Sequence, residues 1–380
     1  MTFKQSAAVR IQALYSADGI LLDSSSKLRL LVVNFNISFS IGLQFRADVF
    51  QIPQQRQALP VTSHIKPTFR SMTLISRLVF FKNKKKTPTK SSDRIKINDI
   101  SIIVPVKDNQ KGVDNYLDNF FATHQSDTFP KEIIIVDNNS KPAIQICSRH
   151  LTSGIVKLIS CKTPGPAAAR NFGALNSSGR WILFNDSDCI PTKSFLTGYV
   201  NADNGSIAYA GNIHSVGKDR LSKYYESQEI LIPLKTYNDS GDFVPQYLIT
   251  ANTLVWRQAF MEVNGFNEKI KIAGGEDVDF GLRLSQVGHL SYAFDSILLH
   301  DFSDGFIGFY KRFKRYGQGN RIVEALWQTD MRPKPFRPNK RTLINEVFAK
   351  LQYLFLLYGY LRADRQIRLV TLGLLLCWLT

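Results

Sequence analysis

The amino-acid sequence predicts an α/β fold with a mixed, mostly parallel sheet flanked by helices. Three observations support this class. Short apolar runs rich in β-branched residues recur along residues 99–302, as in strands that are buried on both faces of a parallel sheet. Stretches with helical spacing separate several of these runs. Acidic residues directly follow two of the runs, at the strand ends where sheets of this kind bind ligands.

Four apolar runs predict the strands of the first half of this sheet. They cover residues 100–106, 133–137, 155–159 and 181–184. Apolar residues at helical spacing predict a helix over 113–121. Pro166 begins a second predicted helix over 166–175, because proline is tolerated in the first helical turn. Further along, we expect strands over 247–255 and 296–299 and a short helix over 257–263.

Two aspartates, one residue apart, follow the fourth predicted strand. Residues i and i+2 of a strand point to the same side, so Asp186 and Asp188 can close on one hard cation. Asp137 ends the second predicted strand, and the carboxyl ends of parallel strands meet at one edge of the sheet. The sequence therefore favours a site for a divalent metal and the phosphate that it holds. A solvated turn rich in Asn, Asp and Ser is the alternative.

A second acidic cluster lies further along the chain. Gly274 and Gly275 precede Glu276 and Asp277 at the start of a predicted helix. The helix dipole favours negative charge in the first turn, so plain capping is one interpretation of these acids. Asp279 lies about 200° around the helix from Asp277 and is expected to point elsewhere.

The N-terminal region is strongly basic. Residues 1–98 hold 16 Lys and Arg against 4 Asp and Glu, which is +12 of the chain's net charge of +17. Short apolar stretches over 12–52 predict a small β element, and a linker rich in Gln and Pro follows it. Such a charge suits nucleic acid, anionic lipid or an acidic partner. Because no nucleic-acid-binding motif accompanies the charge, we expect no specific nucleic-acid partner.

The C-terminal region, residues 328–380, is predicted to be a linker followed by an apolar helical tail. Its two uncharged apolar stretches, 351–361 and 369–380, are each shorter than the about 20 residues that span a membrane. A helical hairpin at a membrane surface is the favoured interpretation. A packed helix pair without membrane contact is the alternative.

Cysteine usage and the first residues bear on the location of the protein. The four cysteines show neither a CxxC pair nor the spacing of a metal finger, which suits a reducing compartment. The first 20 residues lack the apolar core and cleavage site of a secretory signal. We therefore expect a cytoplasmic protein, peripheral on the cytoplasmic face of a membrane where the tail binds one.

Five motifs occur in an order that resembles a known family. They lie at 102–106, 134–140, 165–173, 184–188 and 274–280, and read IIVPV, IIVDNNS, GPAAARNFG, FNDSD and GGEDVDF. Together they resemble the family 2 glycosyltransferases of the GT-A fold, over residues 99–327. The resemblance implies an enzyme that transfers a sugar, with inversion, from a nucleotide-sugar donor to an acceptor hydroxyl. It also implies a divalent metal, Mn²⁺ or Mg²⁺.

The resemblance further implies a role for individual residues. Asp277 is expected to be the general base, with Glu276 as the rival candidate. The expected metal ligands are Asp186, Asp188 and His300, although the first aspartate can reach the sugar or ribose instead, and His300 can be purely structural. The expected donor-binding residues are Pro105, Val106, Asp137, Asn139, Arg170, Asn171, Asp186 and Arg312, with Arg315 as an alternative to Arg312.

Two other classes of function stay open at this stage. A sugar-1-phosphate nucleotidyltransferase has a related core, but it needs a Gly-rich phosphate loop after the first strand, and residues 107–110 contain no glycine. A non-enzymatic protein that binds nucleic acid or membrane is the other class. For the favoured class we expect a UDP- or GDP-sugar donor and a glycan, lipid-linked or small-molecule acceptor.

Overall fold

The computed structural model describes residues 91–238, 241–302 and 304–363, and four short strands nearer the N-terminus. The chain divides into two compact units, residues 1–83 and 84–380. In the first unit, two strand pairs form antiparallel hairpins: β1 (Ile20–Leu22) with β2 (Leu28–Leu30), and β3 (Ser38–Phe39) with β4 (Leu43–Gln44). The predictions for the rest of residues 1–90, and for the apolar stretch 369–380, lie outside the described residues.

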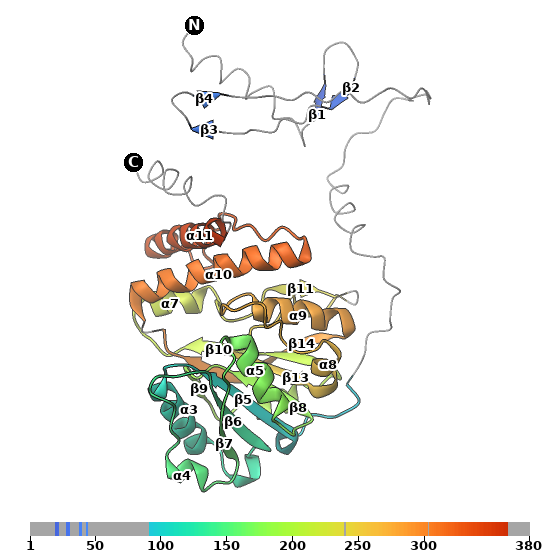
Figure 1. Cartoon of the computed structure of the whole chain (residues 1–380), viewed down its shortest axis with the longest axis vertical. Coiled ribbons are helices and arrows are strands. Elements are labelled where there is room, and N and C mark those ends of the chain that lie inside the picture. The colour runs from blue at the N-terminus through green and yellow to red at the C-terminus, as the bar shows by residue number, and fades with distance from the viewer. Residues whose placement is uncertain are drawn as a thin grey trace, which may run out of the picture. The chain divides into compact units, whose positions relative to one another are not determined.

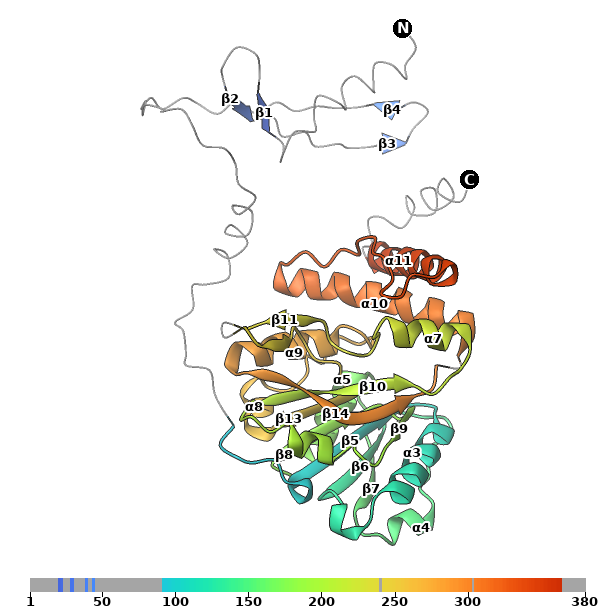
Figure 2. The same ribbon diagram turned by 180° about the vertical axis from the view of Figure 1, so that it is seen from behind.

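One eight-stranded sheet organises the second unit (Figures 1 and 2), in the strand order β7-β6-β5-β8-β13-β10-β14-β9. Its strands are β5 (Ile100–Val106), β6 (Glu132–Asp137), β7 (Val156–Ser160), β8 (Trp181–Asn185), β9 (Cys189–Pro191), β10 (Ala208–Ser215), β13 (Asn252–Trp256) and β14 (Leu290–His300). β5 to β8 are mutually parallel, and β10 is parallel to β14. Only β13 and β9 run against their neighbours, which confirms the predicted mixed, mostly parallel sheet.

The helices of the second unit pack around this sheet and above it. They are α3 (Gln110–Thr123), α4 (Ser148–Leu151), α5 (Pro166–Leu175), α6 (Thr197–Asn201), α7 (Arg220–Ser227), α8 (Arg257–Glu262), α9 (Glu276–Val287), α10 (Gly305–Trp327) and α11 (Leu343–Ala363). A small hairpin of β11 (Lys235–Tyr237) and β12 (Phe243–Pro245) lies against β14. The helices expected over 113–121, 166–175 and 257–263 correspond to α3, α5 and α8.

The strands of the second half differ most from the sequence prediction. β13 begins at Asn252 rather than 247, because residues 247–251 form the approach to the strand. β14 begins six residues before the predicted 296, and its pairing with β10 shifts register between Gly211 and Asn212. β10 was not predicted. Its sequence AYAGNIHS places small and polar residues inside a central strand, so the apolar run that marks a buried strand is missing.

The C-terminal helices α10 and α11 lie side by side, which Figures 1 and 2 both show. Glycines allow the close approach: at Gly317 an added Cβ would collide with the backbone of Leu356, and at Gly359 with the backbone of Lys314. α11 is longer than the predicted stretch 351–361, and it includes Glu346 and Lys350. None of the described helices is both long enough and apolar enough to cross a bilayer.

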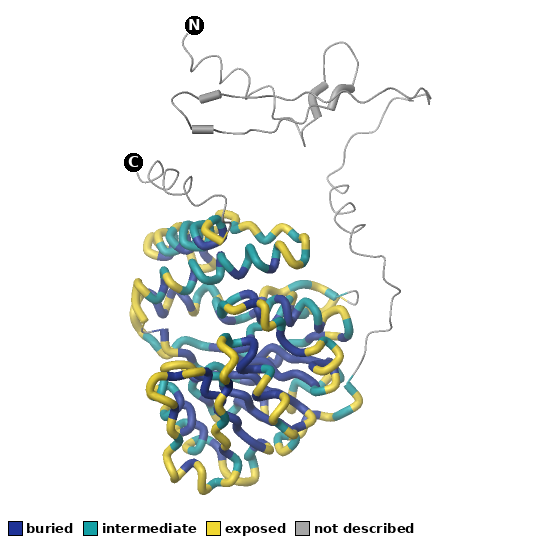
Figure 3. The backbone as a smooth tube through the Cα atoms, in the orientation of Figure 1, coloured by how far each residue is buried: buried dark blue, intermediate teal, exposed yellow. Residues whose placement is uncertain are grey.

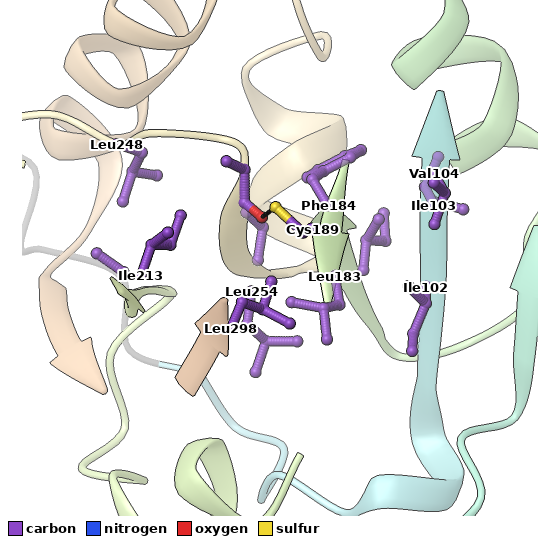
Figure 4. Packing of buried hydrophobic residues seen from close by; sticks show 14 of the residues in the cluster. Ile102, Ile103, Val104, Leu183, Phe184, Cys189, Ile213, Leu248, Leu254 and Leu298 are labelled. Carbon is purple, nitrogen blue, oxygen red and sulfur yellow. Dashed lines mark hydrogen bonds between the residues drawn. The ribbon is translucent and has the colours of Figure 1, made fainter. Parts of the chain in front are cut away.

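The buried residues are concentrated along the sheet (Figure 3), and Figure 4 shows side chains of β5, β8 and β13 packed together there. An aromatic cluster connects β8 to the helices that follow it. The Phe184 ring is perpendicular to those of Phe266 and Phe280, with centroids 5.1 and 6.3 Å away, and the Phe266 and Phe280 rings stack at 4.1 Å. Phe184 lies two residues before Asp186, and Phe280 lies three after Asp277. The core therefore holds the two acidic clusters in a fixed relation.

Candidate active site

The carboxyl ends of β5, β6 and β8 lie at one edge of the sheet, because these strands are parallel. Hydrogen bonds tie their loops together. The Lys141 amide donates to Asp108 Oδ1 over 2.8 Å, and the Asp108 amide donates to Ser140 Oγ over 2.9 Å. Asn109 Nδ2 donates to Ser187 Oγ over 3.2 Å. The acids predicted at the ends of β6 and β8 therefore lie at the same edge of the sheet, where hydrogen bonds connect the loops after the strands.

Asp137 is buried, and the loop after β6 fixes its carboxylate. Oδ1 accepts a hydrogen bond from the Ser140 amide (2.9 Å) and Oδ2 from the Ile144 amide (3.1 Å). Burial works to raise the pKa of Asp137, but hydrogen bonding from the side chain and amide of Ser140 and from the Ile144 amide outweighs it and lowers the pKa. Pro105 and Val106 pair with Val136 and Asp137 in the sheet. The predicted base-binding residues therefore lie side by side.

Asn139 and Asn171 make contacts that differ from those of the other predicted donor-binding residues. Asn139 has a positive φ of 64°, and its Nδ2 donates to the Lys162 carbonyl over 3.1 Å. Asn171 Nδ2 donates to the Phe266 carbonyl, and its Oδ1 accepts from the Phe266 amide, at 2.9 and 2.8 Å. Because both ends of its amide are used by this loop, the structure offers no support for the predicted donor contact of Asn171.

Asp188, in the loop after β8, lies close to His300, at the end of β14. Asp188 Oδ2 lies 3.2 Å from His300 Nε2; the aspartate side chain is 49% exposed and the imidazole 3%. Burial works to raise the pKa of Asp188, but the charges of His300 and Arg312 outweigh it and hold the pKa at about 2. His300 also stacks on Phe302, with ring centroids 4.3 Å apart. The carboxylate is thus ionised and faces an oriented imidazole.

Arg170 connects the two acidic clusters. Its Nη2 donates to Asp186 Oδ1 over 2.8 Å, and its Nη1 donates to Glu276 Oε1 over 2.9 Å. The arginine side chain is 5% exposed and that of Glu276 is 2% exposed. Burial lowers the pKa of the guanidinium, but the two carboxylates outweigh this and raise it. α5 therefore supplies the cation that holds the start of α9 beside the loop after β8.

Asp277 lies on the first turn of α9. The two glycines before this turn have backbone conformations that residues with a Cβ rarely adopt. Gly274 and Gly275 have φ of 116° and 143°, and Gly319 of α10 packs against this turn. Burial and the neighbouring charge of Glu276 raise the pKa of Asp277 to about 7, although Arg170 acts against the rise. A carboxyl group with such a pKa can accept a proton near neutral pH.

Arg312 of α10 approaches the Asp188 side of the site. Its guanidinium lies over the Phe302 ring (5.1 Å) and the Tyr225 ring (5.5 Å), and Nη2 is 3.3 Å from Asp304 Oδ2. Its Nε is buried and has no hydrogen-bond partner among the described residues. This aromatic enclosure holds a positive charge close enough to Asp188 to lower the pKa of that carboxyl.

The donor set can be compared with what a divalent metal requires. Within the described residues, no three His, Cys, Asp or Glu side chains are arranged to hold a metal ion. Asp188 and His300 are in contact, whereas Asp186 uses one oxygen for Arg170. Hard divalent cations at phosphate-transfer sites are held by one or two carboxylates and by the phosphates of the substrate. The Asp188–His300 pair fits a metal that is shared with a bound diphosphate.

Three aromatic residues of the site carried no recognisable sequence signal. Tyr247 precedes β13, and burial together with the nearby charge of Asp277 raises the pKa of its hydroxyl to about 12. Tyr225 of α7 and Phe302 enclose Arg312, and their rings stack with centroids 4.4 Å apart. Such aromatic residues look like ordinary core residues in the sequence, and only the packing shows that they line the site.

Comparisons with known proteins find two family models and several relatives that are similar to this chain. Residues 101–263 match the model of glycosyl transferase family 2, and residues 244–302 match that of the N-terminal domain of galactosyltransferase. The glycosyltransferase AglE of Haloferax volcanii is 26% identical over 276 residues, which cover 69% of this chain and 81% of AglE. The pre-mycofactocin glycosyltransferase of Mycobacterium tuberculosis is 24% identical over 220 residues, which cover 53% of this chain and 43% of that protein.

Two solved structures are also similar. The mannosyltransferase PcManGT of Pyrobaculum calidifontis, in complex with GDP-Man and Mn²⁺, has a TM-score of 0.46 and 16% identity, with 77% of this chain and 83% of that chain covered. TarS 1–349 of S. aureus, in complex with UDP-GlcNAc, has a TM-score of 0.45 and 14% identity, with 70% and 74% covered.

The family match and the named relatives identify this chain as a glycosyltransferase. The part of the chain that matches the model of glycosyl transferase family 2, residues 101–263, carries Asp137, Arg170 and the Asp186–Asp188 pair.

Replacing Arg170 tests the bridge between the acidic clusters. Arg170→Met leaves the buried Glu276 carboxylate without its partner, so we expect the free energy of unfolding to fall by about 3–5 kcal/mol. Arg180→Met is the matched control, since Arg180 is exposed and only 3.6 Å from Asp93; its loss costs about 1 kcal/mol or less. Chemical denaturation measures both, and equal losses in the two variants would contradict the bridge.

Proposed function

We propose that this enzyme is a metal-dependent, inverting glycosyltransferase that moves a sugar from a nucleotide-sugar donor to an acceptor hydroxyl. One observation carries the proposal: Arg170 contacts both Asp186 and Glu276, so a carboxyl group suited to be a base, Asp277, lies next to the Asp-x-Asp loop. A donor held by that loop and an acceptor held by α9 would meet in one place. The resemblance to family 2 supports inversion as part of this proposal.

The donor half of the site is the edge formed by β5, β6 and β8. In our proposal, Pro105, Val106 and Asp137 bind the base, and Arg312 faces the diphosphate. Asp188 and His300 would hold Mn²⁺ or Mg²⁺, with Asp186 as a further ligand or a contact to the sugar. When bound, the metal stabilises the negative charge of the departing nucleoside diphosphate as a Lewis acid. Arg170 acts as a positioning residue, because its guanidinium is used by two carboxylates.

The acceptor half is the first turn of α9. Asp277 takes the proton of the acceptor hydroxyl while the oxygen forms a bond to the anomeric carbon and the bond to the diphosphate breaks. Direct displacement of this kind inverts the anomeric configuration. The Glu276 carboxylate is committed to Arg170 and to the Gly274 amide, at 2.9 and 2.6 Å. This favours Asp277 over Glu276 as the base, and gives Glu276 the task of shaping the turn.

The pKa of Asp277 gives the proposal a pH signature. A base works only when it is deprotonated, and the pKa is raised to about 7, so the rate should rise with pH through about 7 and level off above it. Below that point we expect the rate to fall about tenfold for each pH unit. Initial rates between about pH 5.5 and 8, with donor binding measured at each pH, check this; a flat profile would exclude Asp277 as the titrating base.

The alternatives are less well supported. The loop after β5 has no glycine, and Asn109 instead caps α3 by accepting from the Gly112 amide over 3.0 Å, which disfavours a nucleotidyltransferase. The acceptor is a glycan, a lipid-linked sugar or a small molecule, and a UDP- or GDP-sugar is the proposed donor. A cytoplasmic location, peripheral on a membrane, stays our proposal for the whole chain.

Donor binding can be tested without knowing the acceptor. A panel of UDP- and GDP-sugars is screened for an increase in the melting temperature, with and without Mn²⁺, because a ligand that binds the folded state stabilises it by about 2.7 kcal/mol at 100 times its Kd. We expect at least one donor to stabilise the protein only when the metal is present. Equal melting temperatures across the whole panel would refute a nucleotide-sugar site.

A further inference from the structure

The start of α11 presents an unusual apolar surface. Leu343 is 87% exposed, and Ile344 and Val347 are exposed as well, so the first turn of the helix shows three large apolar side chains to solvent. The opposite side of the helix is used for packing: Phe348 contacts Tyr224, and Gln352 accepts a hydrogen bond from the Tyr224 hydroxyl over 2.7 Å. The exposed turn is therefore not a frayed end, because the same helix is anchored to the enzyme a few residues later.

A strongly basic segment leads directly into this turn. Residues 332–341 contain five cations, Arg332, Lys334, Arg337, Lys340 and Arg341, and no acidic residue. Lys334 pairs with Asp330 at 3.1 Å, whereas Arg337, Lys340 and Arg341 have no carboxylate partner in the described part of the chain. All three are exposed. The charge of this segment is thus available to an anionic surface.

Local hydrogen bonds hold the cations and the apolar turn together. Asn345 Nδ2 donates to the Lys340 carbonyl over 2.8 Å, and the Asn345 amide donates to Thr342 Oγ1 over 3.3 Å, so Thr342 and Asn345 fix the entry to α11. These bonds hold the basic residues Lys340 and Arg341 next to Leu343 at the start of the helix. The neighbouring helix α10 also begins with two exposed apolar residues, Phe306 and Ile307.

We propose that the entry to α11, residues 337–347, docks on an anionic bilayer surface. Apolar side chains next to unpaired cations are the combination that binds the interface of such a bilayer, where the apolar groups enter the headgroup region and each cation adds attraction to anionic lipid. A neutral apolar partner would not account for the three unpaired cations. A nucleic acid would account for the cations but not for Leu343, Ile344 and Val347.

Vesicle flotation of the full chain tests this proposal. Two vesicle types are used, pure phosphatidylcholine and phosphatidylcholine with about 30% phosphatidylglycerol. We expect the wild type to float with the anionic vesicles, with binding that weakens as salt is added. The double variant Leu343→Glu, Val347→Glu and the double variant Lys340→Glu, Arg341→Glu should each bind at least about tenfold more weakly.

Matched controls carry the same chemical changes elsewhere on the surface. There are two control variants, the double variant Leu151→Glu, Leu175→Glu and the double variant Lys193→Glu, Lys218→Glu. Both alter exposed residues far along the chain from α11, and both should bind the vesicles as the wild type does. All variants keep residues 364–380 unchanged, so a difference in flotation reports the entry to α11. Melting temperatures verify that the variants are folded.

Three results would overturn the proposal. One is equal binding of the wild type and both α11 variants, and another is equal flotation with neutral and anionic vesicles. The third is the absence of flotation together with salt-sensitive binding of an oligonucleotide that the same variants lose. Release of nucleoside diphosphate in vesicle-free solution tests the proposed transferase function separately, so the two proposals can fail independently.

Discussion

Asp277→Asn is expected to lower the turnover of sugar transfer by about 10²–10⁴-fold, the contribution of a positioned general base. The amide keeps the shape of the side chain but cannot take the acceptor proton. Donor binding should persist, because Asp277 lies on α9 and does not belong to the Asp188–His300 pair that is proposed to hold the metal. The measurement is the initial rate of nucleoside diphosphate release with saturating donor.

Asp295→Asn is the control for this change, because Asp295 is an exposed aspartate of β14 that is not part of the site. The control should match the wild type. Should Asp277→Asn also match it while Glu276→Gln loses activity at an unchanged melting temperature, the base would be Glu276 instead.

Asp188→Asn should abolish the metal-dependent part of donor binding. The pKa of about 2 keeps this carboxylate ionised beside the nearly buried His300, so Asp188 supplies the negative charge of the proposed metal site. A metal that stabilises a departing diphosphate contributes several kcal/mol, so we expect a loss of about 10²-fold or more in the rate. Donor-induced stabilisation in the presence of Mn²⁺ should disappear as well.

The matched control is Asp127→Asn, on an exposed turn distant in sequence from the site. His300→Gln should show a loss of the same kind as Asp188→Asn but a smaller one, because the ionised Asp188 carboxylate remains. A metal requirement that persists unchanged in Asp188→Asn would show that the metal binds elsewhere.

Much of the fold was predictable because buried parallel strands have a distinctive sequence pattern. Continuous apolar runs located β5, β6, β7 and β8 within one or two residues. Asp137 ends β6, and Asp186 and Asp188 follow β8, so parallel pairing places these acids at one edge. The directions of the strands alone therefore predict that these three acids lie together.

The rest of the site depends on contacts that no local pattern specifies. Arg170 lies 16 residues before Asp186 and 106 before Glu276, so nothing in the sequence indicates that it bridges them. The aromatic enclosure of Arg312 by Tyr225 and Phe302 is equally non-local. β10 was missed for a related reason: its sequence AYAGNIHS contains polar residues with non-local contacts, such as His214, whose Nδ1 lies 2.6 Å from Glu226 Oε1.

The most direct test of the central claim is donor-dependent release of nucleoside diphosphate by three proteins, the wild type, Asp188→Asn and Asp277→Asn, with the UDP- and GDP-sugars and Mn²⁺. We predict release by the wild type from at least one donor, and loss of release in both variants. We also predict that the donor still stabilises Asp277→Asn but no longer stabilises Asp188→Asn. Undiminished release by both variants would contradict the account.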